Sequence, residues 1–284
     1  MVKKKAVKKS AKSVDKSEFE VAWQYLDFEQ IEDEQNAKSS LIDKIITTAG
    51  WILWIVIAYF VANFVMAIIM LILRHYQLID LKNPDTITIG VINILMYIFL
   101  FIFAIFLPVW WSKRKRSGKL KFSDVLTQVG LSRPPKLIDL RYFAADLPVF
   151  YIVNIVISGV AAYILGSETM GQAQSLDFTA TGNVWWQLAI IGFTYIVVAP
   201  VFEEMTMRGF LFGKLRKKLP FLTTAVLVSL LFAVAHGQIN VGIMTFILSM
   251  FACYMREKTG SIWGGIFLHA FSNCVAFILV FLAS

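Results

Sequence analysis

Three apolar stretches in the last third of the chain carry side chains whose types and spacing could support chemistry. They are Glu203, Glu204 and Arg208 in the first stretch, Phe232 and His236 in the second, and His269 and Asn273 in the third. An ionisable group inside hydrocarbon costs so much free energy that it marks a functional site by default. We therefore take these residues as the candidate site.

Helical geometry gives the two neighbouring glutamates different roles. Residues four apart lie on the same face of a helix, so Glu204 faces Arg208 and has the partner that a buried carboxylate needs. Glu203 is turned about 100° away and is left free. A supported carboxylate beside one that can take a proton is the arrangement that acid–base catalysis requires.

The second and third stretches each add an imidazole. His236 shares a helix face with Phe232, so the phenyl ring could pack against it. His269 and Asn273 also share a face, and an imidazole beside a carboxamide can donate hydrogen bonds to a developing oxyanion. Each feature alone has a structural explanation, such as a helix-end ion pair or an interhelical hydrogen bond. Together, with almost no other charges inside the apolar stretches, they favour a functional site.

The composition indicates the class of protein that surrounds this site. Of 284 residues, 58% are hydrophobic and 16% are charged, and the mean hydropathy is +0.68. A multi-pass helical membrane protein fits these values, because helices satisfy their own backbone hydrogen bonds in lipid. The net charge of +8 would suggest a nucleic-acid partner in a soluble protein. Here the basic residues lie beside apolar runs, so membrane orientation explains them and no nucleic acid is expected.

The long apolar runs predict an all-α transmembrane bundle of about seven spans, since a span needs roughly 20 apolar residues. The expected helices cover approximately residues 49–73, 86–111, 139–165, 184–213, 220–236, 240–256 and 261–283. We expect the segment 240–256 to be the shortest, and to be tilted or to cross the membrane only in part.

The loops predict how the bundle is oriented in the cell membrane. Basic residues crowd the segments 112–136, 214–218 and 256–258, whereas the segment 166–183 carries acidic residues and no basic one. By the positive-inside rule the N-terminus is cytoplasmic and the C-terminus lies outside.

The first 45 residues are expected to form a charged cytoplasmic tail, and residues 46–284 the transmembrane domain. Lysines at the start of the tail would attract anionic lipid. Residues 19–28 are either a short amphipathic helix on the membrane surface or part of a solvated, partly disordered tail, and the sequence leaves both open.

Together the motifs resemble those of a known family. Glu-Glu-x-x-x-Arg from Glu203, Phe-x-x-x-His from Phe232 and His-x-x-x-Asn from His269 look like the three motifs of the CAAX protease and bacteriocin-processing (Abi, Rce1-like) intramembrane proteases. The resemblance covers roughly residues 130–283, including a lead-in segment at 130–135. It leaves the tail and the first two spans outside.

The resemblance implies a hydrolase that cuts a peptide bond at or inside the membrane. The implied catalytic residues are Glu203, His236, His269 and Asn273, and the supporting residues are Glu204, Arg208 and Phe232. Glu203 would activate the water with the help of His236, and His269 with Asn273 would stabilise the oxyanion. The implied partners are the lipid bilayer and a membrane-associated peptide or a lipidated, for example prenylated, protein substrate. The alternative is a non-proteolytic immunity factor or partner-binding scaffold.

Zinc stays open as a cofactor, because families of this kind have been classed as metalloproteases. With the Glu204 carboxylate occupied, the possible ligands are Glu203, His236 and His269, which would suffice for a catalytic zinc. Asn273, however, is a poor zinc ligand and a good oxyanion donor. If His269 works with Asn273, too few ligands remain, so we expect no metal cofactor.

Helical rise raises one geometric difficulty. Glu203 and His269 are expected roughly 10–15 Å from the inner loops, and His236 about 20 Å or more, at 1.5 Å per residue. These residues can converge only if the helix at 220–236 is displaced outward or starts beyond the hydrocarbon.

Overall fold

The computed structural model describes residues 16–79, 86–116, 119–172 and 185–283, and every regular element in these ranges is a helix. The predicted all-α class is therefore confirmed. In chain order, with η marking π-helices, the elements are α1 (Lys16–His75), α2 (Thr86–Phe101), η1 (Ile102–Phe106), α3 (Leu107–Arg116), α4 (Phe122–Gln128), α5 (Leu137–Leu165), α6 (Ser167–Met170), α7 (Trp185–Phe193), η3 (Thr194–Val198), α8 (Ala199–Glu204), η4 (Met205–Leu211), α9 (Phe212–Leu215), α10 (Phe221–Ala235), α11 (Ile239–Thr259) and α12 (Trp263–Ala283).

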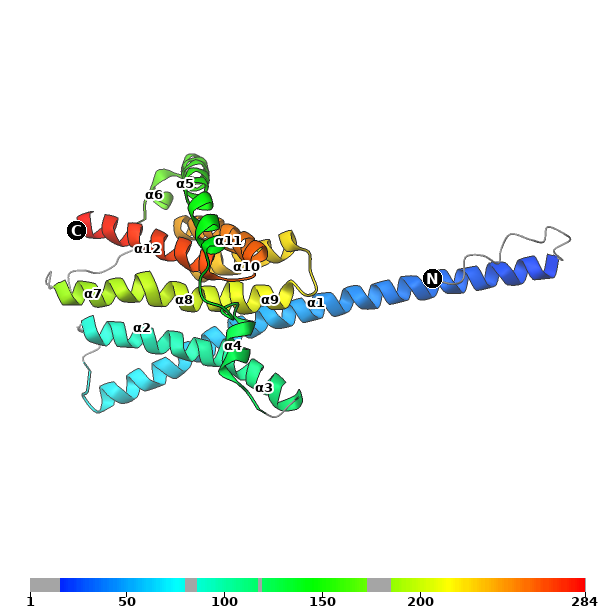
Figure 1. The fold of residues 1–284 in the computed structure, drawn as a ribbon, viewed down its shortest axis with the longest axis horizontal. Coiled ribbons are helices and arrows are strands. Elements are labelled where there is room, and N and C mark those ends of the chain that lie inside the picture. The colour runs from blue at the N-terminus through cyan, green and yellow to red at the C-terminus, as the bar shows by residue number, and fades with distance from the viewer. Residues whose placement is uncertain (1–15, 80–85, 117–118, 173–184, 284) are drawn as a thin grey trace. The chain divides into compact units, whose positions relative to one another are not determined.

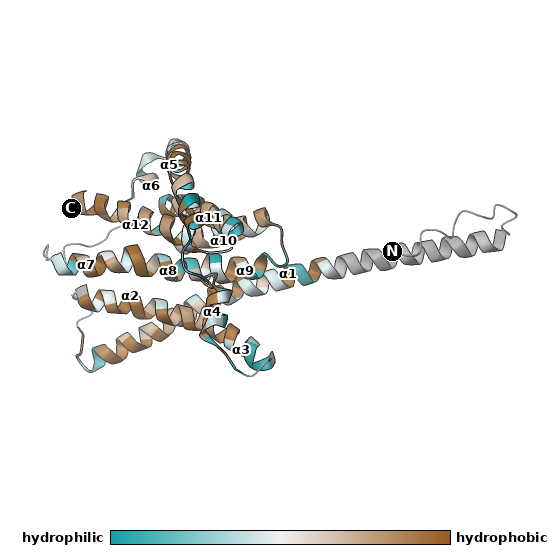
Figure 2. Ribbon diagram, viewed as in Figure 1, coloured by the Kyte–Doolittle hydropathy of each residue, from teal (hydrophilic) through white to brown (hydrophobic). Residues whose placement is uncertain are grey.

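Six helical stretches in the described residues are long and apolar enough to cross a membrane. They are Ser40–His75, Ile87–Lys115, Leu137–Leu165, Trp185–Leu215, Ile239–Thr259 and Trp263–Leu282. Large apolar side chains are exposed on their surfaces, with Phe64 67% and Ile155 70% exposed. Figure 2 shows apolar residues along most of α2, α7 and α12. Such a surface suits lipid better than water, so the multi-pass membrane bundle is confirmed.

The segment predicted at 220–236 forms a shorter apolar helix, α10, of 15 residues. At 1.5 Å per residue it extends about 22 Å, less than the roughly 30 Å of hydrocarbon in a bilayer. Pro220 precedes it, and Gly237, whose φ of 70° suits glycine, follows it. Because α11 has 21 residues, the expectation that residues 240–256 form the shortest helix is wrong.

Two compact units, Met1–Ala49 and Gly50–Ser284, divide the chain, and α1 runs through their boundary. Residues 19–28 lie within α1, so this segment is helical. Its contact with a membrane surface and the role of residues 1–45 as a cytoplasmic tail stay predictions.

α7, η3 and α8 form one continuous helical stretch. α12 lies antiparallel to this stretch, and Figure 1 shows α12 beside it. Near the start of α12, His269 contacts Glu204 at the end of α8. One turn further along α12, Asn273 contacts Tyr195 in the earlier η3. Because α12 runs antiparallel to α8 and η3, the third motif lies against the first.

α10 and α11 form the second antiparallel pair of the larger unit. The hydroxyls of Ser229 and Ser249 hydrogen-bond between them at 2.7 Å, and both side chains are wholly buried. Phe232 of α10 packs with Leu248 of α11 and Leu268 of α12 in one buried cluster. The second motif is thereby held against the third.

Two prolines account for two of the π-helices. η1 ends shortly before Pro108, and η3 ends shortly before Pro200. Proline has no N–H to donate and its ring clashes with the carbonyl four residues earlier, so the helix widens ahead of it. As a result, Glu203 and Glu204 stand on a short α-helical segment between η3 and η4. Such π-helical turns are frequent at functional sites.

The lead-in segment, residues 130–135, is hydrogen-bonded to the residues at the start of α12. Ser261 Oγ donates to Gly130 O at 3.2 Å, and Trp263 Nε1 donates to Arg133 O at 2.9 Å. Arg133 also forms a two-point ion pair with Asp139 at the start of α5, at 2.6 and 2.9 Å. Bonding to this carboxylate raises the pKa of Arg133 above its ordinary value. The lead-in thus ties α5 to α12.

Candidate active site

The candidate residues come from four helical segments in the last third of the chain. α8 supplies Glu203 and Glu204, η4 supplies Arg208, α10 supplies Phe232 and is capped by His236, and α12 supplies His269 and Asn273.

Glu204 is the supported carboxylate that the sequence predicts. Its Oε1 lies 3.0 Å from Nη1 of Arg208, and both side chains are fully buried. The same oxygen lies 3.2 Å from Nδ1 of His269. The predicted pairing of Glu204 with Arg208 is confirmed, and Glu204 holds the imidazole as well. When this carboxylate accepts the hydrogen bond, Nδ1 is the protonated nitrogen of His269.

A glycine of α12 makes room for this carboxylate. A Cβ at Gly265 would lie 2.7 Å from Glu204 Oε2 and 3.2 Å from Cβ of Ala252. Glycine therefore permits the close approach of α12 to α8 that brings His269 onto Glu204.

Glu203 is held between two other helices. Its Oε1 accepts a hydrogen bond of 2.7 Å from the hydroxyl of Tyr97 in α2. Its Oε2 lies 3.7 Å from Nε2 of His269, and its side chain is 20% exposed. The hydrogen-bonding ranges of this oxygen and this nitrogen overlap, so both can reach one small molecule. Glu203 is the accessible carboxylate of the pair.

Tyr97 is the contact that the sequence did not reveal. It lies in an apolar stretch without charges, where a tyrosine resembles any other aromatic residue, and it stands 106 residues before its partner. The signal in the sequence that could have pointed to this contact is the hydroxyl itself, because a buried tyrosine normally finds a hydrogen-bond partner.

Phe232 joins the ion pair to both histidines. The guanidinium carbon of Arg208 lies 4.3 Å from the centroid of its ring. The ring meets His236 edge-on at 4.7 Å and His269 edge-on at 5.8 Å. A cation over an aromatic face is stabilised by the ring quadrupole, so Phe232 packs between the ion pair and the two histidines. Its supporting role in the reaction stays a prediction.

His236 stands at the C-terminal end of α10. Its Nδ1 lies 2.7 Å from the carbonyl oxygen of Phe232. Among the described residues, no hydrogen bond or ion pair joins it to Glu203. The structure therefore brings His236 to the edge of the site through Phe232, while its predicted assistance to Glu203 stays a prediction.

Asn273 forms its hydrogen bond with η3 and not with His269. Its Nδ2 donates a hydrogen bond of 2.8 Å to the backbone carbonyl of Tyr195. Tyr195 belongs to η3, whose π-helical geometry departs from the ordinary backbone ladder. The two residues share a face of α12 as predicted, but His269 contacts the glutamates and Asn273 contacts η3.

The donor atoms do not fit a zinc site. Glu204 is engaged by Arg208 and His269. His236 has its Nδ1 bonded to the backbone and keeps Nε2 for a ligand, but it does not gather with Glu203 and His269 into a set of three donors. Only Glu203 and His269 are left facing one another. In the part of the chain that the structure describes, no group of three His, Cys, Asp or Glu residues could hold a metal ion. Three protein ligands are the usual minimum for catalytic zinc.

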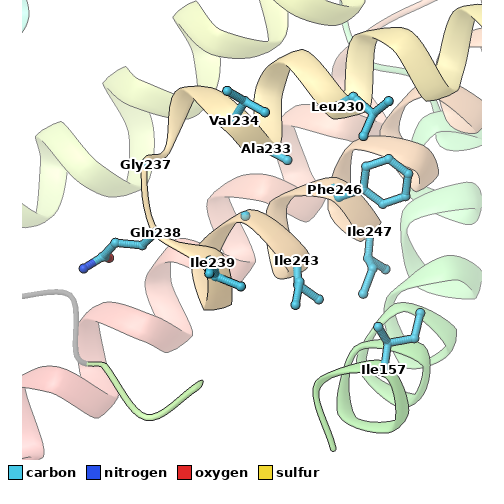
Figure 3. A pocket seen from close by; sticks show the side chains of 11 residues that line it. Ile157, Leu230, Ala233, Val234, Gly237, Gln238, Ile239, Ile243, Phe246 and Ile247 are labelled. Carbon is cyan, nitrogen blue, oxygen red and sulfur yellow. The ribbon is translucent and has the colours of Figure 1, made fainter. Parts of the chain in front are cut away.

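A cavity of about 550 Å³ lies between α10, α11 and α5, and Figure 3 shows its apolar lining. Ala233, Val234 and Leu230 line it from α10. Leu230 and Val234 lie on the face of α10 opposite to the one that Phe232 and His236 share, and none of the candidate residues lines the cavity. The cavity is therefore separate from the candidate site.

Residues 184–275 match the model of a protein family described as type II CAAX prenyl endopeptidase, Rce1-like. No curated protein and no solved structure matches the chain. The matched segment contains all the candidate residues named above, from Glu203 to Asn273, and it confirms the resemblance to the CAAX protease and bacteriocin-processing family. At family level it supports a membrane-embedded protease of the CAAX type. Tyr97 and α2 lie outside it.

Proposed function

We propose that this protein is an intramembrane endopeptidase of the CAAX-protease and bacteriocin-processing type, in which Glu203 activates the water that hydrolyses a peptide bond. The observation that carries the proposal is the difference between the two glutamates. Glu204 is buried and neutralised by Arg208, whereas Glu203 is partly exposed, accepts a hydrogen bond from Tyr97 and lies 3.7 Å from His269. A free carboxylate beside a fixed one suits a general base.

In the proposed reaction Glu203 takes a proton from water while the water oxygen attacks the carbonyl carbon of the scissile bond. The resulting tetrahedral intermediate carries an oxyanion, which preorganised donors stabilise. The protonated Glu203 then gives its proton to the leaving amine, and the carbon–nitrogen bond breaks. No redox step is involved, and the carboxylate is restored.

The donors proposed for the oxyanion are His269 and Asn273. Glu204 fixes the His269 ring through Nδ1 and turns Nε2 toward Glu203, where Nε2 donates when the ring carries both protons. Asn273 retains a second amide hydrogen beside the one that bonds to Tyr195. His236 is proposed to assist from the edge of the site.

The proposed substrate is a membrane-associated peptide or a prenylated protein. Support comes from the description of the matched family, a CAAX prenyl endopeptidase, and from the apolar helices that surround the site. We place the enzyme in the cell membrane with a cytoplasmic N-terminus, because basic residues crowd alternate loops. We propose that it needs no metal cofactor.

The test compares the membrane peptides of cells that produce the wild-type protein with those of cells that produce Glu203→Gln. Products that appear only with the wild type are expected, at equal abundance of the two proteins in the membrane. Glu168→Gln is the matched control, because Glu168 is an exposed residue of α6, and it should leave every product in place. Identical peptides in wild-type and Glu203→Gln cells would favour the non-proteolytic scaffold instead.

A further inference from the structure

Tyr97 reaches the candidate site from a helix that the matched family segment does not include. α2 packs against α7, η3 and α8. Its Tyr97 hydroxyl donates to Oε1 of Glu203 at 2.7 Å, while Oε2 of the same carboxylate faces His269. One oxygen of Glu203 is thus bonded to Tyr97, and the other faces His269.

Aromatic packing fixes the Tyr97 ring independently of this hydrogen bond. The ring stacks on Phe202 with centroids 5.9 Å apart and planes 24° apart. Phe101, one turn along α2, meets Phe202 edge-on at 6.0 Å. Because Phe202 directly precedes Glu203, the same contact aligns the hydroxyl with the carboxylate. Replacement of Tyr97 by phenylalanine would keep this packing and remove only the donor.

A glycine also lets the backbone of α2 approach α7 closely enough for the contact between Tyr97 and Glu203. A Cβ at Gly90 would lie 2.7 Å from Cγ2 of Ile190 in α7. Gly90 and Tyr97 are seven residues apart and share a face of α2. The helix therefore approaches α7 and α8 along the face that carries the tyrosine.

We propose that Tyr97 is a positioning residue for Glu203, an inference that rests on the proposed function. The terminal torsion of a glutamate is broad, so a carboxylate without a fixed donor samples many orientations. The hydroxyl holds Oε1 and directs Oε2 toward His269, where the water must be activated.

The test measures cleavage of a fluorescence-quenched peptide with a farnesylated cysteine in a C-terminal CAAX sequence, using the purified full-length protein in detergent. Tyr97→Phe is expected to lower kcat at least tenfold, with KM within about twofold, since misplacement of a reacting group costs rate rather than binding. Tyr163→Phe is the matched control, because Tyr163 of α5 is 92% exposed, and it should behave as wild type.

The outcomes separate this proposal from the one on which it rests. If Tyr97→Phe keeps the wild-type kcat while Glu203→Gln is inactive, Tyr97 is not a positioning residue. A higher KM with unchanged kcat would make it a substrate contact and would also overturn the proposal. If the wild-type protein leaves the peptide uncut, or Glu203→Gln still cuts it, the proposed function itself fails.

Discussion

Glu204 and Arg208 form a 3.0 Å ion pair whose two side chains are completely buried, whereas the adjacent Glu203 is 20% exposed. One turn of helix thus contains a carboxylate that supports the structure and a carboxylate that is accessible. The different surroundings of these neighbours lead to different expectations for the same substitution.

Glu203→Gln should abolish cleavage while the protein accumulates normally, because glutamine keeps the size of the side chain and loses the base. Glu204→Gln should lose folded protein as well, since it leaves Arg208 buried without a counter-charge, at a cost of roughly 3–5 kcal/mol. Membrane abundance and product formation are measured together for both variants.

The double variant Glu204→Gln/Arg208→Met is the control for this prediction. Removal of both charges should restore much of the abundance, because a buried pair is costly mainly when one partner is missing. It should not restore cleavage, because His269 loses the carboxylate that orients it. Equal abundance of Glu203→Gln and Glu204→Gln would contradict the distinct roles.

Gly265→Ala should destabilise the protein by about 1–3 kcal/mol, the usual cost of overpacking. The new Cβ would stand 2.7 Å from Glu204 Oε2 and would push α12, with His269, away from α8. Thermal unfolding in detergent measures this loss.

Gly159→Ala provides the comparison, because no atom lies within 4 Å of the Cβ position at Gly159 in α5. There the substitution should be neutral or stabilise by roughly 0.5–1 kcal/mol, as alanine favours the helix. If the two variants unfold at the same temperature, the space beside Glu204 is not restrictive.

Sequence reasoning identified the Glu204–Arg208 pair because both residues belong to one helix, where spacing alone determines the shared face. It could not identify what that face meets. His269 was expected to work with Asn273, which is one turn away, yet it contacts the glutamates of α8. The tertiary arrangement of α8 and α12 decides this, and the spacing within either helix does not contain it.

The length of α10 and the contribution of Tyr97 were missed for related reasons. Residues 220–236 are as apolar as a span, but Pro220 and Gly237 bound a helix of only 15 residues. This short helix places His236 at its C-terminal end. The depth expected for His236, greater than that of Glu203 and His269, was counted along a longer helix. Tyr97 carries no charge, so only the packing of α2 against α8 shows its place beside Glu203.

Orientation in the membrane is tested with single cysteines at Glu168 and Lys217, in a background in which Cys253 and Cys274 are replaced. Both positions are exposed. Because the loop around Lys217 is basic and the segment around Glu168 is not, an impermeant maleimide should label the cysteine at 168 in intact cells. The cysteine at 217 should react only after permeabilisation. The reverse pattern would overturn the predicted cytoplasmic N-terminus.

Removal of metal should leave the activity intact. Glu204 is committed to Arg208 and His269, and among the described residues no three His, Cys, Asp or Glu side chains gather to hold a metal ion. Glu203 and His269 are therefore the two donors that could approach one ion. Two ligands hold zinc too weakly for a catalytic site, which normally uses three. Protein purified in detergent and treated with a strong chelator should therefore cut the farnesylated peptide at the untreated rate. Glu203→Gln, treated in the same way, measures the background. Loss of activity that zinc restores at one ion per chain would show that His269 is a ligand, and that the site rearranges to supply the missing donors.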